Sequence, residues 1–241
     1  MALSPRAALI RAAAARLRVG VVPVWLLLAV GVVLALTTLD VANHGMLTVI
    51  DHAVSRRMTH WDLRHRRWSL SLIYPLTLFG QRGTVLAVTI PTVAYLVWRS
   101  RSTDPGVRYL LALASLAGAV YAVKDLLHRT APPTDLLHTA AGASYPSGHV
   151  ANAVLVWATV WYSARAIDPD WVLTRALDLV RRVGPVAVMI GMTLLDYHWV
   201  SDFIAGACIA TILLALVTHP AWRRWSRYLD RQIWRSVRPA H

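Results

Sequence analysis

The chain has 241 residues, of which 56% are hydrophobic and 15% are charged, and its formal net charge is +13. Average soluble domains carry about 25% charged residues, so this composition excludes an ordinary soluble domain, and the high apolar content excludes a disordered chain. A single cysteine, Cys208, excludes an intramolecular disulfide and a zinc site built from cysteines. The composition therefore predicts a membrane protein.

The charged residues are unusual in kind. All 12 acidic residues are aspartate, and 24 of the 25 basic residues are arginine, which leaves Lys124 as the one lysine. The arginines gather at the ends of apolar segments, a placement that favours contact with lipid headgroups over a face that binds nucleic acid. We expect membrane lipids as partners and no nucleic acid. The Arg-, Ala- and Val-rich composition is also typical of a GC-rich bacterial genome.

Six apolar segments are expected to cross the membrane, because a bilayer core requires about 20 apolar residues per helix. In chain order they are residues 19–39, 83–98, 107–127, 148–167, 183–198 and 202–218. The first is expected to be an uncleaved span, because a signal peptide has a shorter apolar stretch and a small-residue cleavage site. The pattern predicts an all-α polytopic helical bundle.

Basic and polar segments flank these spans. Residues 1–18 form a basic N-terminus, 40–80 contain interfacial helices, 128–147 form a Pro-rich loop, and 168–182 form a basic loop. The tail, residues 220–241, interleaves arginine with tryptophan, which predicts an amphipathic helix on an anionic surface.

The distribution of basic residues predicts the orientation of the membrane domain, residues 19–219. With both termini in the cytoplasm, 17 basic residues lie on the cytoplasmic side and eight on the outer side. Cytoplasmic loops carry an excess of Lys and Arg, so we expect a multi-pass protein of the plasma (inner) membrane with both termini inside. Lys124, the 128–147 loop and the junction of spans five and six then share the outer face.

Ionisable residues gather at three places on that face, in residues 124–132, 145–149 and 196–202. Such residues are rare in membrane helices and mark functional sites. Ser147 and Gly148 stand at the start of the fourth span, where free N–H groups and the helix dipole bind phosphate oxygens.

Side chains in the same segments complete a predicted phosphate site. Lys124 supplies a point charge, and Arg129 supplies a guanidinium fork. His198 and Asp202 are four residues apart and share a face if the helix is continuous. An aspartate bonded to one ring nitrogen makes the other nitrogen a better nucleophile or base, and His149 is then the acid that protonates the leaving oxygen.

At these residues the chain resembles the type 2 phosphatidic acid phosphatases, the PAP2 superfamily of lipid phosphatases. The matching positions are Lys124 and Pro132 in the family's first motif (Lys-x6-Arg-Pro), residues 146–149 (Pro-Ser-Gly-His) in the central motif, and His198, Asp202 and Gly206 in the third. The resemblance covers about residues 19–219 and agrees with the six-span layout.

The resemblance implies a phosphatase that needs no metal or other cofactor and works through a phosphohistidine. Carried over to this chain, the implied roles are nucleophile for His198, its orienter for Asp202, general acid for His149, and phosphate binding for Lys124, Ser147 and Gly148. The implied substrate is a membrane lipid phosphate: polyprenyl phosphate or pyrophosphate, phosphatidic acid, or phosphatidylglycerol phosphate.

Two departures from the family pattern concern arginines. Ala131 stands where the family has the arginine before Pro132, and Met192 stands where it has an arginine six residues before the third-motif histidine. A charge-assisted hydrogen bond contributes about 1.5–3 kcal/mol, so the loss of two arginines is expected to weaken the binding of phosphate oxygens. Arg129 is expected to compensate for one loss, and Arg82 or an arginine of residues 56–67 for the other.

Because these two arginines are missing, two alternatives to hydrolysis stay open. One is a lipid phosphotransferase that passes the group to an acceptor other than water, and the other is a catalytically silent protein that binds lipid phosphates. Each residue also has a simpler structural explanation: Lys124 as a snorkelling side chain, Ser147 as an ordinary helix cap, and His198 with Asp202 as a polar pair between helices.

Overall fold

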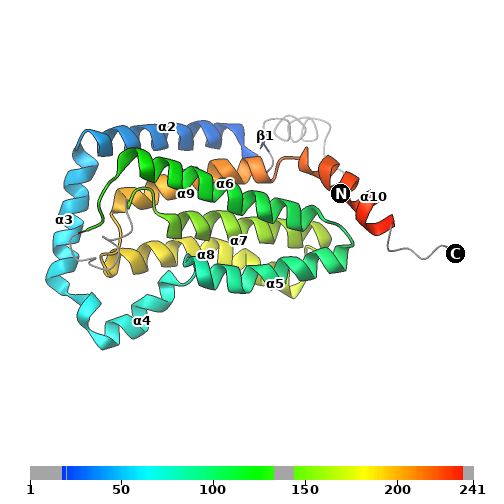
Figure 1. Cartoon of the computed structure of the whole chain (residues 1–241). Coiled ribbons are helices and arrows are strands. Elements are labelled where there is room, and N and C mark those ends of the chain that lie inside the picture. The colour runs from blue at the N-terminus through cyan, green and yellow to red at the C-terminus, as the bar shows by residue number, and fades with distance from the viewer. Residues whose placement is uncertain (1–17, 20, 133–143, 236–241) are drawn as a thin grey trace, which may run out of the picture.

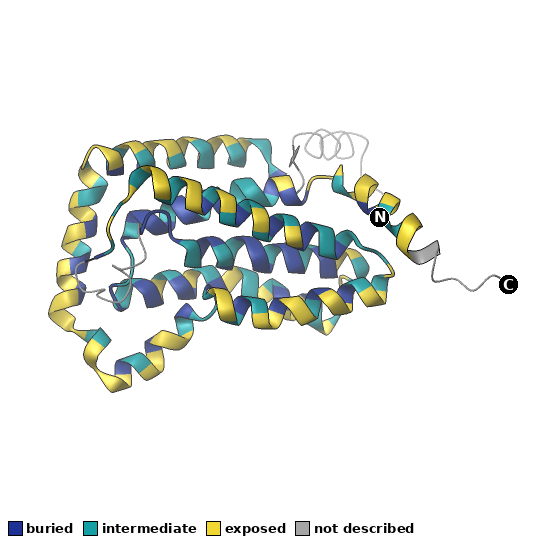
Figure 2. Ribbon diagram, viewed as in Figure 1, coloured by how far each residue is buried: buried dark blue, intermediate teal, exposed yellow. Residues whose placement is uncertain are grey.

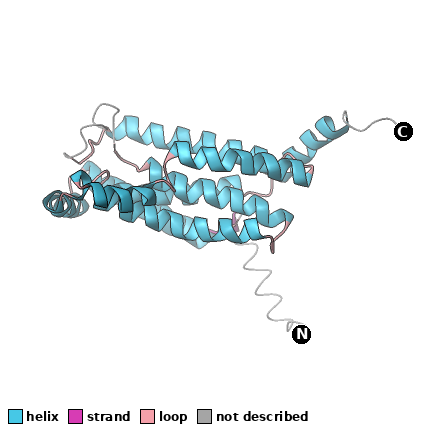
Figure 3. Cartoon of the chain, turned by 90° about the horizontal axis from the view of Figure 1, so that it is seen from below, coloured by secondary structure: helices cyan, strands magenta, loops and turns pink. Residues whose placement is uncertain are grey.

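The protein is a helical bundle in the computed structural model, which describes residues 18–19, 21–132 and 144–235. Its α-helices are α2 (Val24–Ala42), α3 (Met46–Trp61), α4 (Arg67–Thr77), α5 (Arg82–Ser100), α6 (Asp104–Leu127), α7 (Gly148–Ile167), α8 (Val172–Leu194), α9 (Val200–Val217) and α10 (Trp222–Arg235), with a short 3-10 helix at Leu63–His65. Strands β1 (Arg18–Val19) and β2 (Val22–Pro23) form one small antiparallel pair. The all-α class is confirmed (Figure 3).

Helix α7 is the centre of the bundle. It packs against α5, α6, α8 and α9, and α2 lies along the outer side of α9 (Figure 1). Leu155, Val156 and Val160 of α7 are fully buried, and Figure 2 shows this helix as the most continuously buried one. Because α7 begins at the predicted phosphate motif, the best-packed helix of the molecule carries that motif.

The outer helices have the surface of a membrane protein. Helices α2, α6 and α9 are the three described helices that are long and apolar enough to cross a membrane by the criteria of length and hydropathy. Helix α2 exposes large apolar side chains such as Leu28 and Leu36 along its length, and contiguous exposed apolar surface marks contact with lipid or protein. Helices α5, α7 and α8 run in the same bundle, and the full count of six spans stays a prediction.

The expected basic loop over residues 168–182 is wrong in most of its length, because α8 already begins at Val172. Two intrahelical ion pairs explain the longer helix. Asp178 binds Arg181 one turn later and Arg182 at 2.7 Å, and pairs at these spacings stabilise a helix. The guanidinium of Arg181 also lies 3.7 Å from the ring centroid of Trp161 on α7. The fifth apolar segment is therefore the second half of a longer helix.

The first span also begins later than expected, at Val24 rather than at residue 19. The chain before it is held in the short β1–β2 pair, and Pro23 precedes the first helical residue. Proline lacks a backbone donor, and its fixed backbone angle suits a helix start, where that donor would have no partner within the helix. The N-terminal residues 1–17, residues 133–143 of the predicted loop and the last six residues of the tail lie outside the described residues.

Helices α3 and α4 occupy the segment in which interfacial helices are expected. They cross one end of the bundle, where α2 and α6 end and α7 begins, whereas α10 lies at the other end (Figure 1). The helix expected in the tail is present as α10. Asp230 of α10 accepts hydrogen bonds from Ser102 and from the backbone N–H of Thr103, beside the start of α6.

Candidate active site

Two of the three predicted segments are joined directly through their backbones. The N–H of Ser147 donates to the carbonyl oxygen of Asp202 at 3.0 Å, so the Pro-Ser-Gly-His segment lies on the first turn of α9. A Cβ atom added to Gly206 would lie 2.5 Å from the carbonyl oxygen of Ser147, a distance that two such atoms do not adopt. Gly206 therefore permits the contact that brings the two motifs together.

Ser147 forms the N-cap of α7, and its hydroxyl oxygen accepts from the N–H of Val150 at 3.4 Å. Tyr145, two residues earlier, is completely buried, and its hydroxyl is 2.8 Å from that of Thr38 on α2. Burial raises the pKa of the Tyr145 phenol, which keeps the hydroxyl protonated for this contact. The peptide bond between Tyr145 and Pro146 is cis. The segment before α7 is thus tied to both α9 and α2.

The predicted histidine–aspartate pair is present. Nδ1 of His198 lies 3.0 Å from Oδ2 of Asp202, and because a carboxylate only accepts, Nδ1 carries the proton and Nε2 keeps its lone pair. The pair does not lie on one continuous helix, since α9 begins at Val200. Asp202 instead caps that helix start by accepting from the N–H of Trp199 at 3.2 Å, which turns its carboxylate back toward His198.

His149 and His198 face each other across the site. Their ring centroids are 5.8 Å apart with a T-shaped arrangement. Both line a cavity of about 540 Å³ at this end of the bundle, together with Lys124 from the last turn of α6 and Gly148 from the first residue of α7. Four of the predicted site residues are therefore gathered around one cavity.

The cavity wall also contains the two positions that depart from the family pattern. Ala131 and Met192 both line it, so an arginine at either position would have faced the same space. Arg82, the first residue of α5, lines the cavity as well, and its Nη1 is 3.4 Å from the hydroxyl of Tyr121. From the other basic segment, the Arg64 guanidinium lies 5.1 Å from the ring centroid of Tyr197, a further cavity residue.

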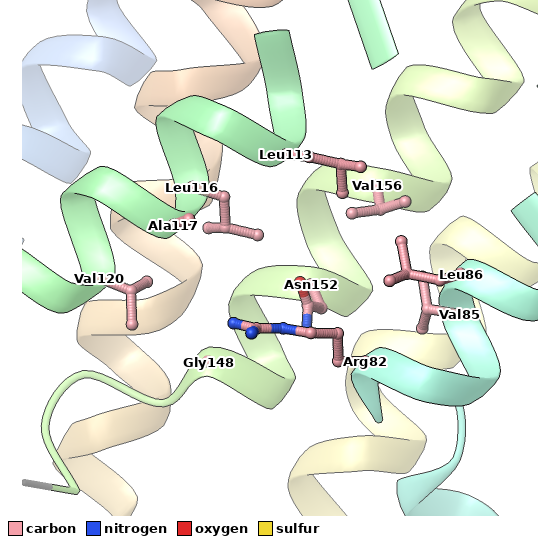
Figure 4. A pocket seen from close by; sticks show the side chains of 10 residues that line it. All are labelled: Arg82, Val85, Leu86, Leu113, Leu116, Ala117, Val120, Gly148, Asn152 and Val156. Atoms are coloured by element: carbon pink, nitrogen blue, oxygen red, sulfur yellow. The ribbon is translucent and has the colours of Figure 1, made fainter. Parts of the chain in front are cut away.

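A second cavity of about 220 Å³ continues the first one between α5, α6 and α7. The two cavities share Arg82, Val120, Gly148 and Asn152. The rest of the second cavity is apolar, and its lining consists of Val85, Leu86, Leu113, Leu116, Ala117 and Val156 (Figure 4). A cavity that carries two cations and two histidines thus continues into one with a mostly apolar lining, which suits an amphiphilic ligand.

Two predicted phosphate ligands lie elsewhere than expected. Ser147 is fully buried and forms the cap beneath the cavity rather than its wall. Arg129 is directed to two carboxylates: its Nη1 is 3.0 Å from Asp202, and its Nη2 is 2.7 Å from Asp51. Within the described part of the chain, no group of three or more His, Cys or Asp side chains is placed to hold a metal ion.

Asp51 is the site residue that the sequence did not reveal. It belongs to α3, it is 2% exposed, and it accepts from the backbone N–H of Ser201 at 3.0 Å. Its place in a polar, interfacial segment gave no sign of burial. The one available signal is the recurrence of Asp51, Ser55 and Met58 at helical spacing, the three buried residues of α3.

The chain is similar to known proteins both in a family sequence profile and in its fold. The sequence profile of the PAP2 superfamily matches residues 105–226. The fold is similar to the crystal structure of a transmembrane PAP2-type phosphatidylglycerolphosphate phosphatase from Bacillus subtilis, with a TM-score of 0.64 and 23% sequence identity over 84% of this chain and 96% of that chain. No curated protein sequence matches this chain. The matched profile spans half of the chain and includes every predicted site residue.

Proposed function

The chain belongs to the PAP2 superfamily, and from this premise we propose that it hydrolyses a membrane lipid phosphate through a phosphohistidine intermediate. The observation that carries the proposal is the arrangement of His198, His149 and Lys124 around one cavity that continues into an apolar space. A nucleophile, an acid and a cation surround the place for a phosphoryl group, and the apolar space suits the lipid chain next to it.

The first step forms the covalent intermediate. The Nε2 lone pair of His198 attacks phosphorus, and the bond between phosphorus and the lipid oxygen breaks. Asp202 holds the Nδ1–H of His198 and stabilises the positive charge that develops on the ring. His149, whose ring faces that of His198, donates a proton to the leaving lipid oxygen.

The second step releases phosphate. His149, now neutral, takes a proton from a water molecule whose oxygen attacks phosphorus, and the bond between phosphorus and Nε2 of His198 breaks. The phosphoryl oxygens are stabilised in both steps by Lys124, by the N–H groups at the start of α7, and by Arg82. The N–H groups at the helix start are fixed in place, and fixed donors of this type contribute about 10²–10³ in rate each. The Ser147 hydroxyl supports the same helix start from below.

The proposed substrate is a phosphorylated lipid rather than a soluble ester, because most side chains that line the second cavity are apolar. Phosphatidylglycerol phosphate, phosphatidic acid and polyprenyl phosphate or pyrophosphate all combine a phosphate with apolar chains. The proposal includes a six-span topology in the plasma membrane, with both termini in the cytoplasm and the site on the outer side, as the distribution of basic residues indicates.

Phosphate transfer to an acceptor other than water, or silent binding of a lipid phosphate, is the second candidate. The observation that favours it is the presence of Ala131 and Met192 in the cavity wall. With neither arginine in place, fewer cations stabilise the transition state, which lowers the rate of hydrolysis before it lowers the affinity for lipid.

Phosphate release in detergent micelles with EDTA present tests the proposal. A panel of lipid phosphates is compared for the wild type, His198→Ala, and His65→Ala as a control on an exposed histidine outside the cavity. We expect release by the wild type and the control, and none by His198→Ala, because that variant lacks the attacking nitrogen.

The other outcomes are equally informative. Full activity in His198→Ala would exclude the phosphohistidine route, and activity lost in EDTA would contradict metal-independent hydrolysis. A folded wild type that binds the lipids without releasing phosphate would favour the second candidate. Addition of alcohol acceptors would then separate transfer from silent binding.

A further inference from the structure

Arg129 connects two buried carboxylates behind the nucleophile. Its Nη1 donates to Oδ1 of Asp202, the oxygen that His198 does not use, and its Nη2 donates to Oδ2 of Asp51. Asp202 is 0% exposed and Asp51 is 2% exposed. Buried carboxylates are costly unless they are paired and hydrogen-bonded, so the guanidinium stabilises both at once.

The side chain of Arg129 is held away from the cavity. Its guanidinium lies 5.2 Å from the ring centroid of Trp199, its Nη1 also donates to the Ser201 hydroxyl at 2.6 Å, and the side chain is only 13% exposed. Arg129 does not line the cavity that holds His149 and His198. Its hydrogen bonds therefore go to protein groups around the histidine–aspartate pair, whereas Lys124 and Arg82 face the cavity.

Helix α3 holds the other end of this connection. The carboxylate of Asp51 accepts from both the N–H and the hydroxyl of Ser201 in addition to Arg129. One and two turns further along α3, Ser55 and Thr59 donate to Oδ2 of Asp196 at 3.0 and 3.3 Å. Asp196 lies in the α8–α9 loop before His198, and Ser201 lies in the first turn of α9 after it. Helix α3 therefore binds the chain on both sides of the histidine.

We propose that Asp51 and Arg129 are positioning residues for the histidine–aspartate pair, an inference that rests on the function proposed above. Arg129 fixes one oxygen of Asp202, which keeps the other directed at Nδ1 of His198, and Asp51 fixes Arg129. Groups that orient a reactive side chain without touching the substrate act on the rate of the chemical step rather than on substrate binding.

The kinetic test compares Asp51→Asn and Arg129→Gln with the wild type. Asp51→Asn keeps the shape of the side chain and does not alter the cavity wall. We expect kcat to fall about 10- to 100-fold in each variant, by analogy with the loss of a residue that orients a functional side chain from behind. KM and inhibition by inorganic phosphate are expected to stay unchanged. The double variant is expected to be no slower than the slower single one, because both changes break the same connection.

The matched control is Asp104→Asn, which removes the carboxylate partner of the fully buried Arg108 at the other end of α6. It leaves a buried arginine with less pairing, as Asp51→Asn does, but outside the site. We expect Asp104→Asn to lower the melting temperature without changing kcat per folded molecule. An unchanged kcat in Asp51→Asn would overturn the proposal, as would a raised KM and weaker phosphate inhibition in Arg129→Gln alone, which would make Arg129 a phosphate ligand.

A second measurement does not depend on activity. In protein labelled with ¹⁵N-histidine, the Nδ1–H resonance of His198 is assigned by its loss in His198→Ala. We expect Asp51→Asn and Arg129→Gln to shift or broaden that resonance, and Asp104→Asn to leave it in place. An unchanged resonance in both site variants would overturn the positioning role. A wild type that keeps the resonance but releases no phosphate would contradict the proposed function alone.

Discussion

Arg82 occupies an unfavourable place for a cation. It is the first residue of α5, where the helix dipole is positive and a basic side chain is disfavoured. Lys124, by contrast, stands in the last turn of α6, where a cation is stabilised. The guanidinium of Arg82 nevertheless reaches across the cavity mouth toward Gly148 and Asn152 (Figure 4). Because Arg82 lines the same cavity as Ala131 and Met192, we propose that it replaces one of the arginines absent at those two positions and is stabilised there by a bound phosphate.

Substitution of Arg82 tests whether it binds the phosphate. Arg82→Ala is expected to lower kcat/KM for the lipid phosphate about 10-fold, since one partly solvated charge-assisted contact is lost. Inhibition by inorganic phosphate is expected to weaken by a similar factor. Arg99→Ala is the control, because Arg99 lies in the last turn of the same helix and contacts Trp171 instead. Equal losses in the two variants would contradict a phosphate-binding role for Arg82.

At the scale of elements, the site depends on how closely α9 approaches the start of α7. Gly206 lies one turn after Asp202, and its missing side chain leaves room for the carbonyl of Ser147. The same contact sets the hydrogen bond between the Ser147 N–H and the Asp202 carbonyl. A change in this spacing moves the phosphate-binding helix start relative to the nucleophile.

Gly206→Ala is expected to reduce both stability and kcat, because its Cβ atom would lie 2.5 Å from a backbone oxygen that cannot rotate away. Overpacking of this kind costs about 1–3 kcal/mol, which lowers the melting temperature by several degrees. Gly118→Ala on α6 is the matched control, since an added Cβ there meets nothing within 4 Å. Thermal unfolding and turnover of the two variants are compared, and a stable, fully active Gly206→Ala would contradict the argument.

Some parts of this arrangement could be predicted from the sequence, and others could not. The helices followed from apolar runs, and the meeting of His149, His198 and Lys124 followed from the predicted membrane topology and the resemblance to the PAP2 superfamily. The start of α9 at Val200 did not follow, because Asp202 caps the helix and the four-residue spacing only resembled a helical pair. The role of Asp51 could not be predicted either. It meets Ser201 from 150 residues away, and no local periodicity encodes that contact.

At the scale of the whole molecule, the bundle has two different ends. Helices α3 and α4 lie at one end, and the arginine-rich α10 lies at the other (Figure 1). The cavity is lined by residues from the end of α6 and the start of α7, at the end of the bundle that α3 and α4 cross. If basic α10 faces the cytoplasm as proposed, the phosphate site opens toward the outer side. The exposed apolar surface of α2 between the two ends then contacts lipid.

Single cysteines test this orientation. In a Cys208→Ser background, which removes the buried native thiol, Arg66→Cys lies beside α4 and Arg231→Cys lies on α10. A membrane-impermeant maleimide added to intact cells is expected to label the first cysteine, and to label the second only after permeabilisation. The reverse pattern would place the phosphate site in the cytoplasm, and labelling of both in intact cells would contradict the separation of the two ends.

The solitary lysine in the cavity wall gives the molecule a built-in reporter. Because Lys124 is the only lysine in the sequence, an amine-selective reagent has one side-chain target, and that target faces the proposed phosphate. A ligand bound in the site is expected to reduce modification of Lys124, which mass spectrometry can measure. The measurement needs no substitution in the protein, and it also detects ligands that are bound but not hydrolysed. Candidate substrates can thus be found by their effect on the chemical reactivity of one atom, the Nζ of Lys124.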